Sequence, residues 1–184
     1  MPKVSIIIVG YNSRKFLKGC LDSVYNQAFK DIDVFFVDNN SQDNSVAYIK
    51  SNYPDVSIIA NKANLGFCRA NNQAIKISEA KYILTLNPDV ILEKDFLSTT
   101  AGFLEKETNN RIGMVSGKML RPDKVTIDST GLILTKFRRF YDRGSGKIDT
   151  GQCDRIEQIF GPCAAAGFYK REMLEDIKEN DEYF

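Results

Sequence analysis

The sequence predicts an α/β domain in which a mostly parallel central sheet carries helices on both faces. Apolar runs of strand length recur at residues 3–9, 33–38, 56–60 and 82–86, and segments of helical pattern separate them. Continuous runs of β-branched residues are typical of strands that are buried on both faces. Strands that alternate with helices indicate parallel pairing through crossover connections. A chain of 184 residues suits one domain of this kind.

Helical spacing marks the segments between these strands. The first helix is predicted over residues 13–27, with Ser13 as its N-terminal cap. Its apolar side chains are Phe16, Leu17, Cys20, Leu21, Val24 and Tyr25. Residues 43–52 and 67–79 give the second and third helices. The side chains expected to be buried in the third are Ala70, Ala74, Ile75 and Ile77.

The second half of the chain has a looser pattern. Residues 93–107 predict a helix and residues 112–120 predict a strand. Residues 138–154 are basic, polar and rich in glycine, which is typical of a mobile loop. Residues 156–177 predict a strand followed by a helix, and the last six residues predict no closing element.

Composition excludes several classes of function. The 25 basic and 24 acidic residues leave a net charge of +1, so no nucleic-acid partner is indicated. The chain has no histidine, which excludes histidine-based chemistry. Its four cysteines are scattered without a CxxC pair, which favours reduced thiols in the cytoplasm over a zinc site. The apolar run near the N-terminus is too short to span a membrane and has no signal-peptide features.

Polar side chains follow each of the four apolar runs. They lie at Tyr11–Ser13, Asp38–Ser41, Asn61–Gly66 and Asn87–Asp89. Because ligands of open parallel sheets bind at the carboxyl ends of the strands, these four loops predict a single polar cleft.

The glycine-rich loops that commonly hold phosphates are missing. The first strand leads into "VGYNSRKF" instead of GxGxxG, and no GxxxxGK[ST] occurs. A diphosphate bound without such a loop usually needs a divalent cation, and a hard cation needs oxygen ligands. Asp89, at the end of a strand, is placed for that role.

Each of these polar residues also has a purely structural interpretation. Ser41 and Asp43 could cap the following helix, although capping alone does not explain the carboxylate that ends the second strand. Tyr11 could be an ordinary half-buried aromatic, and Asp89 could belong to a turn that ends the fourth strand. Gly66 could occupy a tight turn at positive φ, which is compatible with ligand binding.

Five segments together resemble the inverting family 2 glycosyltransferases with the GT-A fold, within them the bacterial rhamnosyltransferase-like branch that builds surface polysaccharides. The resemblance covers nearly the whole chain. Its segments are "VSIIIVGYN" (4–12), "VDNNSQDNS" (37–45), "NLGFCRANNQAI" (64–75), "LNPDV" (86–90) and "GPCAAAGFYKREML" (161–174).

The resemblance implies a UDP- or dTDP-sugar donor. Tyr11 would stack on the base, and Asp38 would accept a hydrogen bond from the imide N–H of uracil or thymine. Residues 64–72, with Arg69 as a further contributor, would line the ribose and diphosphate. Asp89 matches the carboxylate of the DxD motif that holds Mg²⁺ or Mn²⁺, while its first carboxylate is an amide here. The implied donor-binding residues are Tyr11, Asn12, Asp38, Asn40, Asn64, Gly66, Asn72, Asn87 and Asp89.

The expected function is transfer of a sugar, with inversion, to a polysaccharide or lipid-linked acceptor. Residues 1–92 would bind the nucleotide sugar, and residues 93–184 would form an incomplete acceptor-side half. The family's general base is expected beyond Phe184, so no catalytic residue is identified, and Asp181 and Glu182 match the spacer that precedes it.

Two functions other than sugar transfer are considered for the same sequence. A nucleotide-sugar-binding fragment without transferase activity is the alternative. A nucleotidyltransferase is disfavoured because no glycine-rich, arginine-containing loop follows the first strand. The expected location is the cytoplasm, with contact at the inner face of the membrane left open. Apolar surface at residues 159–174 is expected to favour homo-oligomers.

Overall fold

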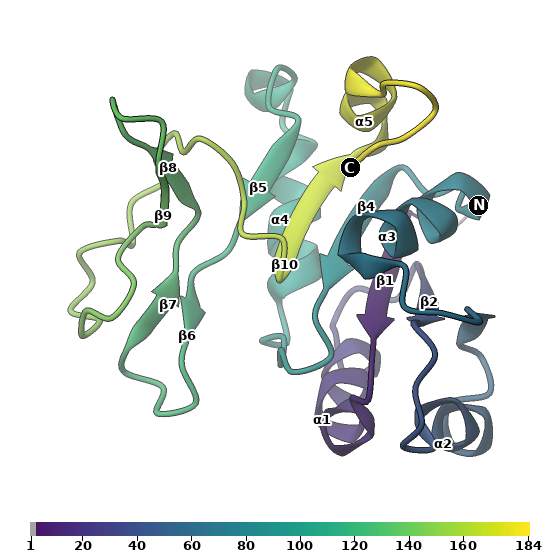
Figure 1. Ribbon diagram of the computed structural model, residues 1–184. Helices are drawn as coiled ribbons and strands as arrows, with labels where there is room; N and C mark the ends of the chain where they lie inside the picture. Colours follow the sequence, from purple (N-terminus) through teal and green to yellow (C-terminus); the bar gives the residue numbers. More distant parts are fainter. Residues whose placement is uncertain (1–2) are drawn as a thin grey trace.

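A six-stranded sheet forms the centre of the computed structural model, which describes residues 3–184 (Figure 1). The strand order is β3-β2-β1-β4-β10-β5. The strands are β1 (Val4–Gly10), β2 (Ile32–Asp38), β3 (Ser57–Ala60), β4 (Tyr82–Leu86), β5 (Met114–Ser116) and β10 (Ala166–Lys170). The first four run parallel, and β10 is antiparallel to both β4 and β5. The predicted mostly parallel sheet is confirmed.

Helices cover both faces of this sheet. They are α1 (Arg14–Tyr25), α2 (Ser45–Asn52), α3 (Gly66–Ile77), α4 (Phe96–Leu104) and α5 (Arg171–Ile177). Successive side chains of a strand point to opposite faces, and in β1 Ile6 and Ile8 pack with α1, α2 and α4 while Ile7 packs with α3 and α5. Each fully buried side chain of this size contributes about 1.5–3 kcal/mol. Burial on both faces explains why the strands are continuous apolar runs.

Some helical predictions differ from the structure in detail. Ile77 was expected in the core but is 59% exposed, because α3 ends at this residue and the chain turns extended at Ser78. Phe16 lies at the margin of the apolar stripe of α1 and is also exposed, whereas the other core positions of that stripe are buried or half-buried. The fourth helix is shorter than predicted and is followed by a 3-10 turn, η1 (Glu107–Asn109).

A lobe of short strands lies beside the main sheet, next to β5 (Figure 1). It contains β6 (Met119–Leu120) paired with β7 (Ile127–Ser129) and β8 (Leu132–Leu134) paired with β9 (Phe140–Asp142). The single strand predicted over residues 112–120 is wrong: the segment divides into β5 of the main sheet and β6 of the lobe.

The segment predicted as a mobile loop, residues 138–154, belongs to this lobe. It contains β9, and the amide of Ile127 donates to the carbonyl of Lys147 at 2.8 Å. Lys118 forms ion pairs with Asp149 and Asp154. The glycines of the segment therefore lie in turns between hydrogen-bonded parts of the lobe, and the prediction of a mobile loop is wrong.

The expected apolar surface at residues 159–174 is largely absent from the structure. Phe168 and Tyr169 are buried because β10 lies between β4 and β5, and only Phe160 is strongly exposed. The end of the chain also folds back: the ring of Phe184 contacts that of Tyr169 with centroids 5.5 Å apart. Among the described residues, no helix has the length and apolar character needed to cross a bilayer.

Candidate functional site at the carboxyl edge of the sheet

The polar loops after β1, β2 and β4 leave the sheet along one edge. Gly10 lies opposite Asp38 in the β1–β2 register, and Ile8 lies opposite Leu86 in the β1–β4 register. The amide of Asn39 donates to the carbonyl of Gly10 at 2.8 Å, which continues the pairing one step beyond the strands. The sequence-based expectation that these strand ends converge is met for these loops.

Asp38 has one carboxylate oxygen without a partner. The residue is only 3% exposed, and its Oδ2 accepts a hydrogen bond from the amide of Ser41 at 3.0 Å. Its Oδ1 is buried and receives no hydrogen bond from residues 3–184. Buried polar atoms are nearly always hydrogen-bonded, so this oxygen is available to accept a hydrogen bond from a group that the described residues do not supply. The local turn therefore provides a hydrogen-bond donor for only one of the two carboxylate oxygens of Asp38.

The loop after β1 and the loop after β2 are hydrogen-bonded to each other. The amide of Asn12 donates to Oγ of Ser41 at 2.9 Å, and Oδ1 of Asn12 accepts from the amide of Gln42 at 2.8 Å. Asn12 and Asn40 adopt φ values of 51° and 68°, in the left-handed region that asparagine tolerates. These contacts fix the backbone around Tyr11, whose side chain is 54% exposed and therefore free to stack on a ligand.

Asp43 supports the starts of two helices. Its carboxylate accepts from the amide of Arg14, the first residue of α1, at 2.7 Å, and from the amide of Ser45, the first residue of α2, at 3.1 Å. Burial alone would raise the pKa of this carboxyl, but these hydrogen bonds hold its pKa below the ordinary value. The capping interpretation of Asp43 is confirmed. Ser13, predicted as the cap of α1, makes no side-chain capping bond.

Asn39 joins the end of β2 to the start of α3. Its Nδ2 donates to the carbonyl of Gly66 at 3.2 Å, and its Oδ1 accepts from Nδ2 of Asn61 at 3.1 Å and from the amide of Leu65 at 3.5 Å. Sequence reasoning missed this residue. The signal in the sequence was its position directly after Asp38, where an amide side chain at the end of one strand can reach the loop that follows a neighbouring strand.

Gly66 meets the expectation of a tight turn. Its φ is +79°, and its amide donates to Oδ1 of Asn64 at 2.9 Å. A methyl group added at Gly66 would have no atom within 4 Å, so the space beside the backbone is open. Arg69, on the same exposed first turn of α3, forms no ion pair with the described residues.

Replacing Asn39 with alanine is expected to lower the free energy of unfolding by about 1–3 kcal/mol, because this buried amide makes three hydrogen bonds to residues 61–66 that would be lost. Urea unfolding followed by circular dichroism measures this change. Asn110→Ala removes an exposed amide and is the matched control, with an expected change within about 0.5 kcal/mol. Equal stability of the two variants would contradict the bridging role of Asn39.

Asn72 lies in a different setting from the other expected donor-binding residues. Its side chain is buried, and its Nδ2 donates to the carboxylate of Glu182 and, at 3.1 Å, to the carbonyl of Phe184. Its Oδ1 accepts from the amides of Tyr183 and Phe184, both at 3.2 Å. Both polar atoms of the Asn72 side chain are thus hydrogen-bonded to residues 182–184. The sequence pattern predicted no structural element for this last segment.

Asn87 and Asp89 lie in a turn that ends β4. The amide of Asn87 donates to the carbonyl of Ala165 at 2.9 Å, and its carbonyl accepts from the amide of Val90 at 3.1 Å. The turn interpretation is correct for the backbone. The carboxylate of Asp89 is exposed and forms no ion pair with basic side chains of the described region. Burial, and then the charge of Asp89, raise the pKa of the Cys20 thiol to about 12, so this neighbour stays neutral.

The surroundings of Asp89 fit a cation that is shared with a ligand. Residues 3–184 contain no group of three or more His, Cys, Asp or Glu side chains arranged to hold a metal ion. Mg²⁺ is commonly bound by one or two carboxylates together with substrate phosphates, and such a site needs no cage made by the protein alone. An exposed, unpaired carboxylate at the end of a strand meets that requirement.

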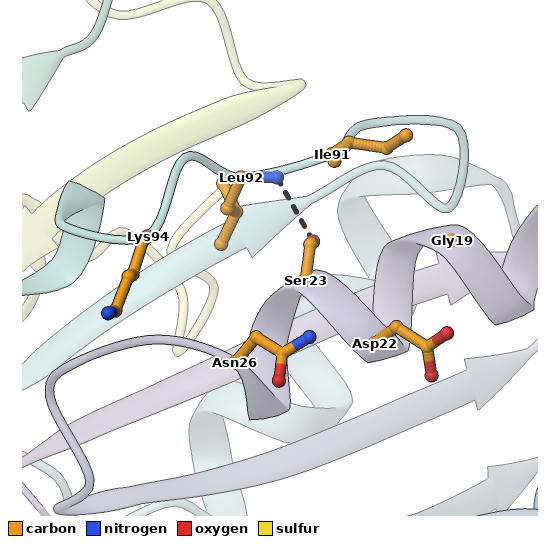
Figure 2. Close-up of a pocket in the computed structure, with 7 residues that line it drawn as sticks. All are labelled: Gly19, Asp22, Ser23, Asn26, Ile91, Leu92 and Lys94. Atoms are coloured by element: carbon orange, nitrogen blue, oxygen red, sulfur yellow. Dashed lines mark hydrogen bonds between the residues drawn. The ribbon is translucent and has the colours of Figure 1, made fainter.

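The depression drawn in Figure 2 lies between α1 and the segment that follows Asp89. Its lining residues are Gly19, Asp22, Ser23, Asn26, Ile91, Leu92 and Lys94. Oγ of Ser23 accepts a hydrogen bond from the amide of Leu92 at 3.0 Å, and Asp22 is already paired with Lys18 and Tyr53. Asp22 and Ser23 are therefore engaged in local contacts, and the candidate site remains the edge formed by the strand ends.

The central sheet and the helices on its two faces have the arrangement of the GT-A fold. The mannosyltransferase PcManGT from Pyrobaculum calidifontis, solved with GDP-Man and Mn²⁺, aligns with a TM-score of 0.68 and 19% identity over 96% of this chain and 46% of that chain. TarS from S. aureus, solved with UDP, aligns with a TM-score of 0.63 and 19% identity over 95% of this chain and 48% of that chain. Both likenesses concern the fold.

Residues 5–177 match Glycosyl transferase family 2, and the chain belongs to this family of transferases. Chondroitin synthase from Escherichia coli is 35% identical over 98 residues, which are 52% of this chain and 14% of that protein. Poly(ribitol-phosphate) β-glucosyltransferase from Bacillus spizizenii is 33% identical over 122 residues, 62% of this chain and 19% of that protein. The chain spans about half the length of the two solved structures above. Its match covers less than a fifth of the length of chondroitin synthase and of the β-glucosyltransferase.

Proposed function

We propose that this chain binds a UDP- or dTDP-sugar together with Mg²⁺ or Mn²⁺ and transfers the sugar, with inversion, to a glycan or lipid-linked acceptor. The proposal rests on two observations: the buried Oδ1 of Asp38 has no partner among the described residues, and the exposed Tyr11 directly follows Gly10, which lies opposite Asp38 in the sheet. An aromatic ring next to a hydrogen-bond acceptor suits a flat base that also offers an N–H group.

The pairing state of Asp38 favours uracil or thymine over guanine. Its Oδ2 is already used by the amide of Ser41, which leaves one free oxygen. The imide of uracil or thymine offers one N–H, whereas guanine offers two neighbouring donors that would suit both oxygens of a carboxylate. The structural neighbours bind different nucleotides, GDP-Man in PcManGT and UDP or UDP-GlcNAc in TarS, so the base needs a direct test.

The remaining edge residues are assigned to the ribose and diphosphate. We assign Asn12 and Asn40 to the nucleotide and Asn64 to the ribose and diphosphate, where the open space beside Gly66 would let a phosphate approach the backbone. Asp89, with Asn87 beside it, would hold the cation, and a bound cation stabilises negative charge on a departing nucleoside diphosphate. We assign Asn72 a positioning role through residues 182–184.

A surface polysaccharide or a lipid-linked glycan is the acceptor that the family and the printed names of the relatives favour. Assignment to the rhamnosyltransferase-like branch predicts a preference for dTDP over UDP. Four free cysteines fit action in a reducing cytoplasm. Within residues 3–184 we assign no general base, because the resemblance places the base beyond Phe184 and matches Asp181 and Glu182, which form ion pairs with Lys76, to the spacer before it. Binding of the donor without transfer is therefore the second candidate.

Calorimetric titration of UDP, dTDP and GDP in the presence of Mn²⁺ tests the proposal. UDP or dTDP is expected to bind more tightly than GDP, and Asp38→Asn is expected to weaken binding about 10–100-fold, since a hydrogen bond to a charged group contributes about 1.5–3 kcal/mol. Preference for GDP would overturn the assignment of the base. No binding of any nucleotide by folded protein would overturn the donor site itself.

A further inference from the structure

The β8–β9 hairpin carries a basic and aromatic tip, residues 136–139, with the sequence KFRR. Phe137 is 75% exposed, and Lys136 lies with its Nζ 5.1 Å from the centroid of that ring. None of the three cations of the tip forms an ion pair with an acidic side chain of the described residues. Three like charges thus flank, in the sequence, an aromatic ring that is largely exposed in the described part of the chain.

The tip has a defined backbone. The amide of Arg138 donates to the carbonyl of Thr135, and the amide of Thr135 donates to the carbonyl of Arg139, both at 2.9 Å. The other edge of β8 is also paired, because Leu132 exchanges hydrogen bonds of 2.7 and 2.9 Å with residues 160–161. The tip therefore lies at the end of paired strands, and these hydrogen bonds fix its backbone.

Apolar side chains continue from the tip along the hairpin. Exposed large residues in β8, β9 and the adjoining segment are Ile133, Leu134, Phe140, Tyr141 and Phe160. The rings of Phe140 and Phe160 contact each other with centroids 5.0 Å apart. Figure 1 shows β8 and β9 at the margin of the molecule, in the lobe that lies beside β5. Nothing in the described part of the chain approaches this margin from outside.

We propose that the hairpin tip binds an anionic membrane surface. Phe137 would enter the boundary between headgroups and acyl chains, and Lys136, Arg138 and Arg139 would contact lipid phosphates. Basic residues near a membrane are attracted by anionic lipids, and exposed aromatic rings between them add apolar burial. A soluble polyanion would satisfy the cations but would leave the ring of Phe137 in water, so the combination favours a membrane. This inference is independent of which nucleotide the domain binds.

A tryptophan placed at the tip reports insertion directly, because the chain contains no tryptophan. Phe137→Trp is mixed with vesicles of phosphatidylcholine alone and of phosphatidylcholine with phosphatidylglycerol. We expect a blue shift of emission, and quenching by brominated acyl chains, only with the phosphatidylglycerol vesicles. Ile177→Trp, at an exposed position of α5, is the control and should show neither change.

Vesicle sedimentation measures the contribution of the charges. Each Lys or Arg near an anionic surface strengthens binding about fivefold, so Lys136→Gln/Arg138→Gln/Arg139→Gln is expected to bind on the order of 100-fold more weakly. Lys50→Gln/Lys94→Gln/Lys106→Gln removes three exposed cations elsewhere and should bind nearly as the unchanged chain does. Circular dichroism establishes that both variants are folded.

Three outcomes would overturn the proposal. Equal loss of binding in the two triple variants would show that net charge, rather than the tip, attracts the protein to the membrane. Equal binding to neutral and anionic vesicles would remove the role assigned to the cations. Binding of the tip to soluble polyphosphate without binding to phosphatidylglycerol vesicles would make it a site for a polyanion instead.

Discussion

Asp89→Ala is expected to weaken the binding of UDP or dTDP about 100-fold in the presence of Mn²⁺, because the variant lacks the carboxylate that we propose links the cation to the protein. Without Mn²⁺, the variant and the unchanged chain should bind the nucleotide equally, since the base and ribose contacts are untouched. Calorimetric titration with and without the metal separates the two effects. The comparison isolates metal-dependent affinity from affinity for the base.

Asp95→Ala is the matched control for this experiment. Asp95 is also exposed, follows Asp89 closely in the chain, and makes no capping hydrogen bond at the start of α4. Its replacement should leave affinity unchanged in both conditions. An equal loss in Asp89→Ala with and without Mn²⁺ would show that Asp89 acts on the nucleotide directly and would remove its assignment as the metal ligand.

Gly10→Ala is expected to lower the free energy of unfolding by about 1–3 kcal/mol through overpacking. An added Cβ would lie 2.6 Å from two ring carbons of Phe36 and 2.6 Å from Oγ of Ser13. Phe36 is fully buried, so its ring has no space to withdraw. Because Gly10 lies opposite Asp38, the displaced backbone would also weaken nucleotide binding. Urea unfolding and calorimetry on the same sample measure both changes.

Gly102→Ala makes the same chemical change but is expected to raise the free energy of unfolding. Gly102 lies inside α4, and a Cβ there would meet no atom within 4 Å. Alanine in place of glycine in a helix interior stabilises by about 0.5–1 kcal/mol, so this variant should unfold at a higher urea concentration. Destabilisation of similar size in both variants would show that the cost at Gly10 does not come from its contact with Phe36.

The central sheet could be predicted from sequence because its signals are local. The four apolar runs became β1 to β4, and the polar residues that follow them lie at strand ends as expected. The capping role of Asp43 and the tight turn at Gly66 also depend on short-range geometry. The carboxylate of Asp43 lies within hydrogen-bonding distance of two helix starts, and Gly66 adopts a positive φ.

The lobe and the long-range contacts could not be predicted in the same way. Strands β5 to β9 are two or three residues long, too short for a periodic pattern to emerge. The hydrogen bonds of Asn72 join residues more than a hundred positions apart, and those of Asn39 depend on how β2 and α3 pack. Such contacts arise from tertiary arrangement, which the spacing of residue types along the chain does not encode.

The antiparallel strand β10 has a consequence for how this architecture can diversify. Ala166 pairs with Leu86, so everything from the end of β4 to the start of β10 forms one excursion between adjacent strands. Closing a longer excursion costs little, about 0.6 kcal/mol for each doubling of its length. Insertions and deletions within the lobe, which lies outside the main sheet, can therefore accumulate while the register of the sheet, and the edge that carries Asp38, stay as they are.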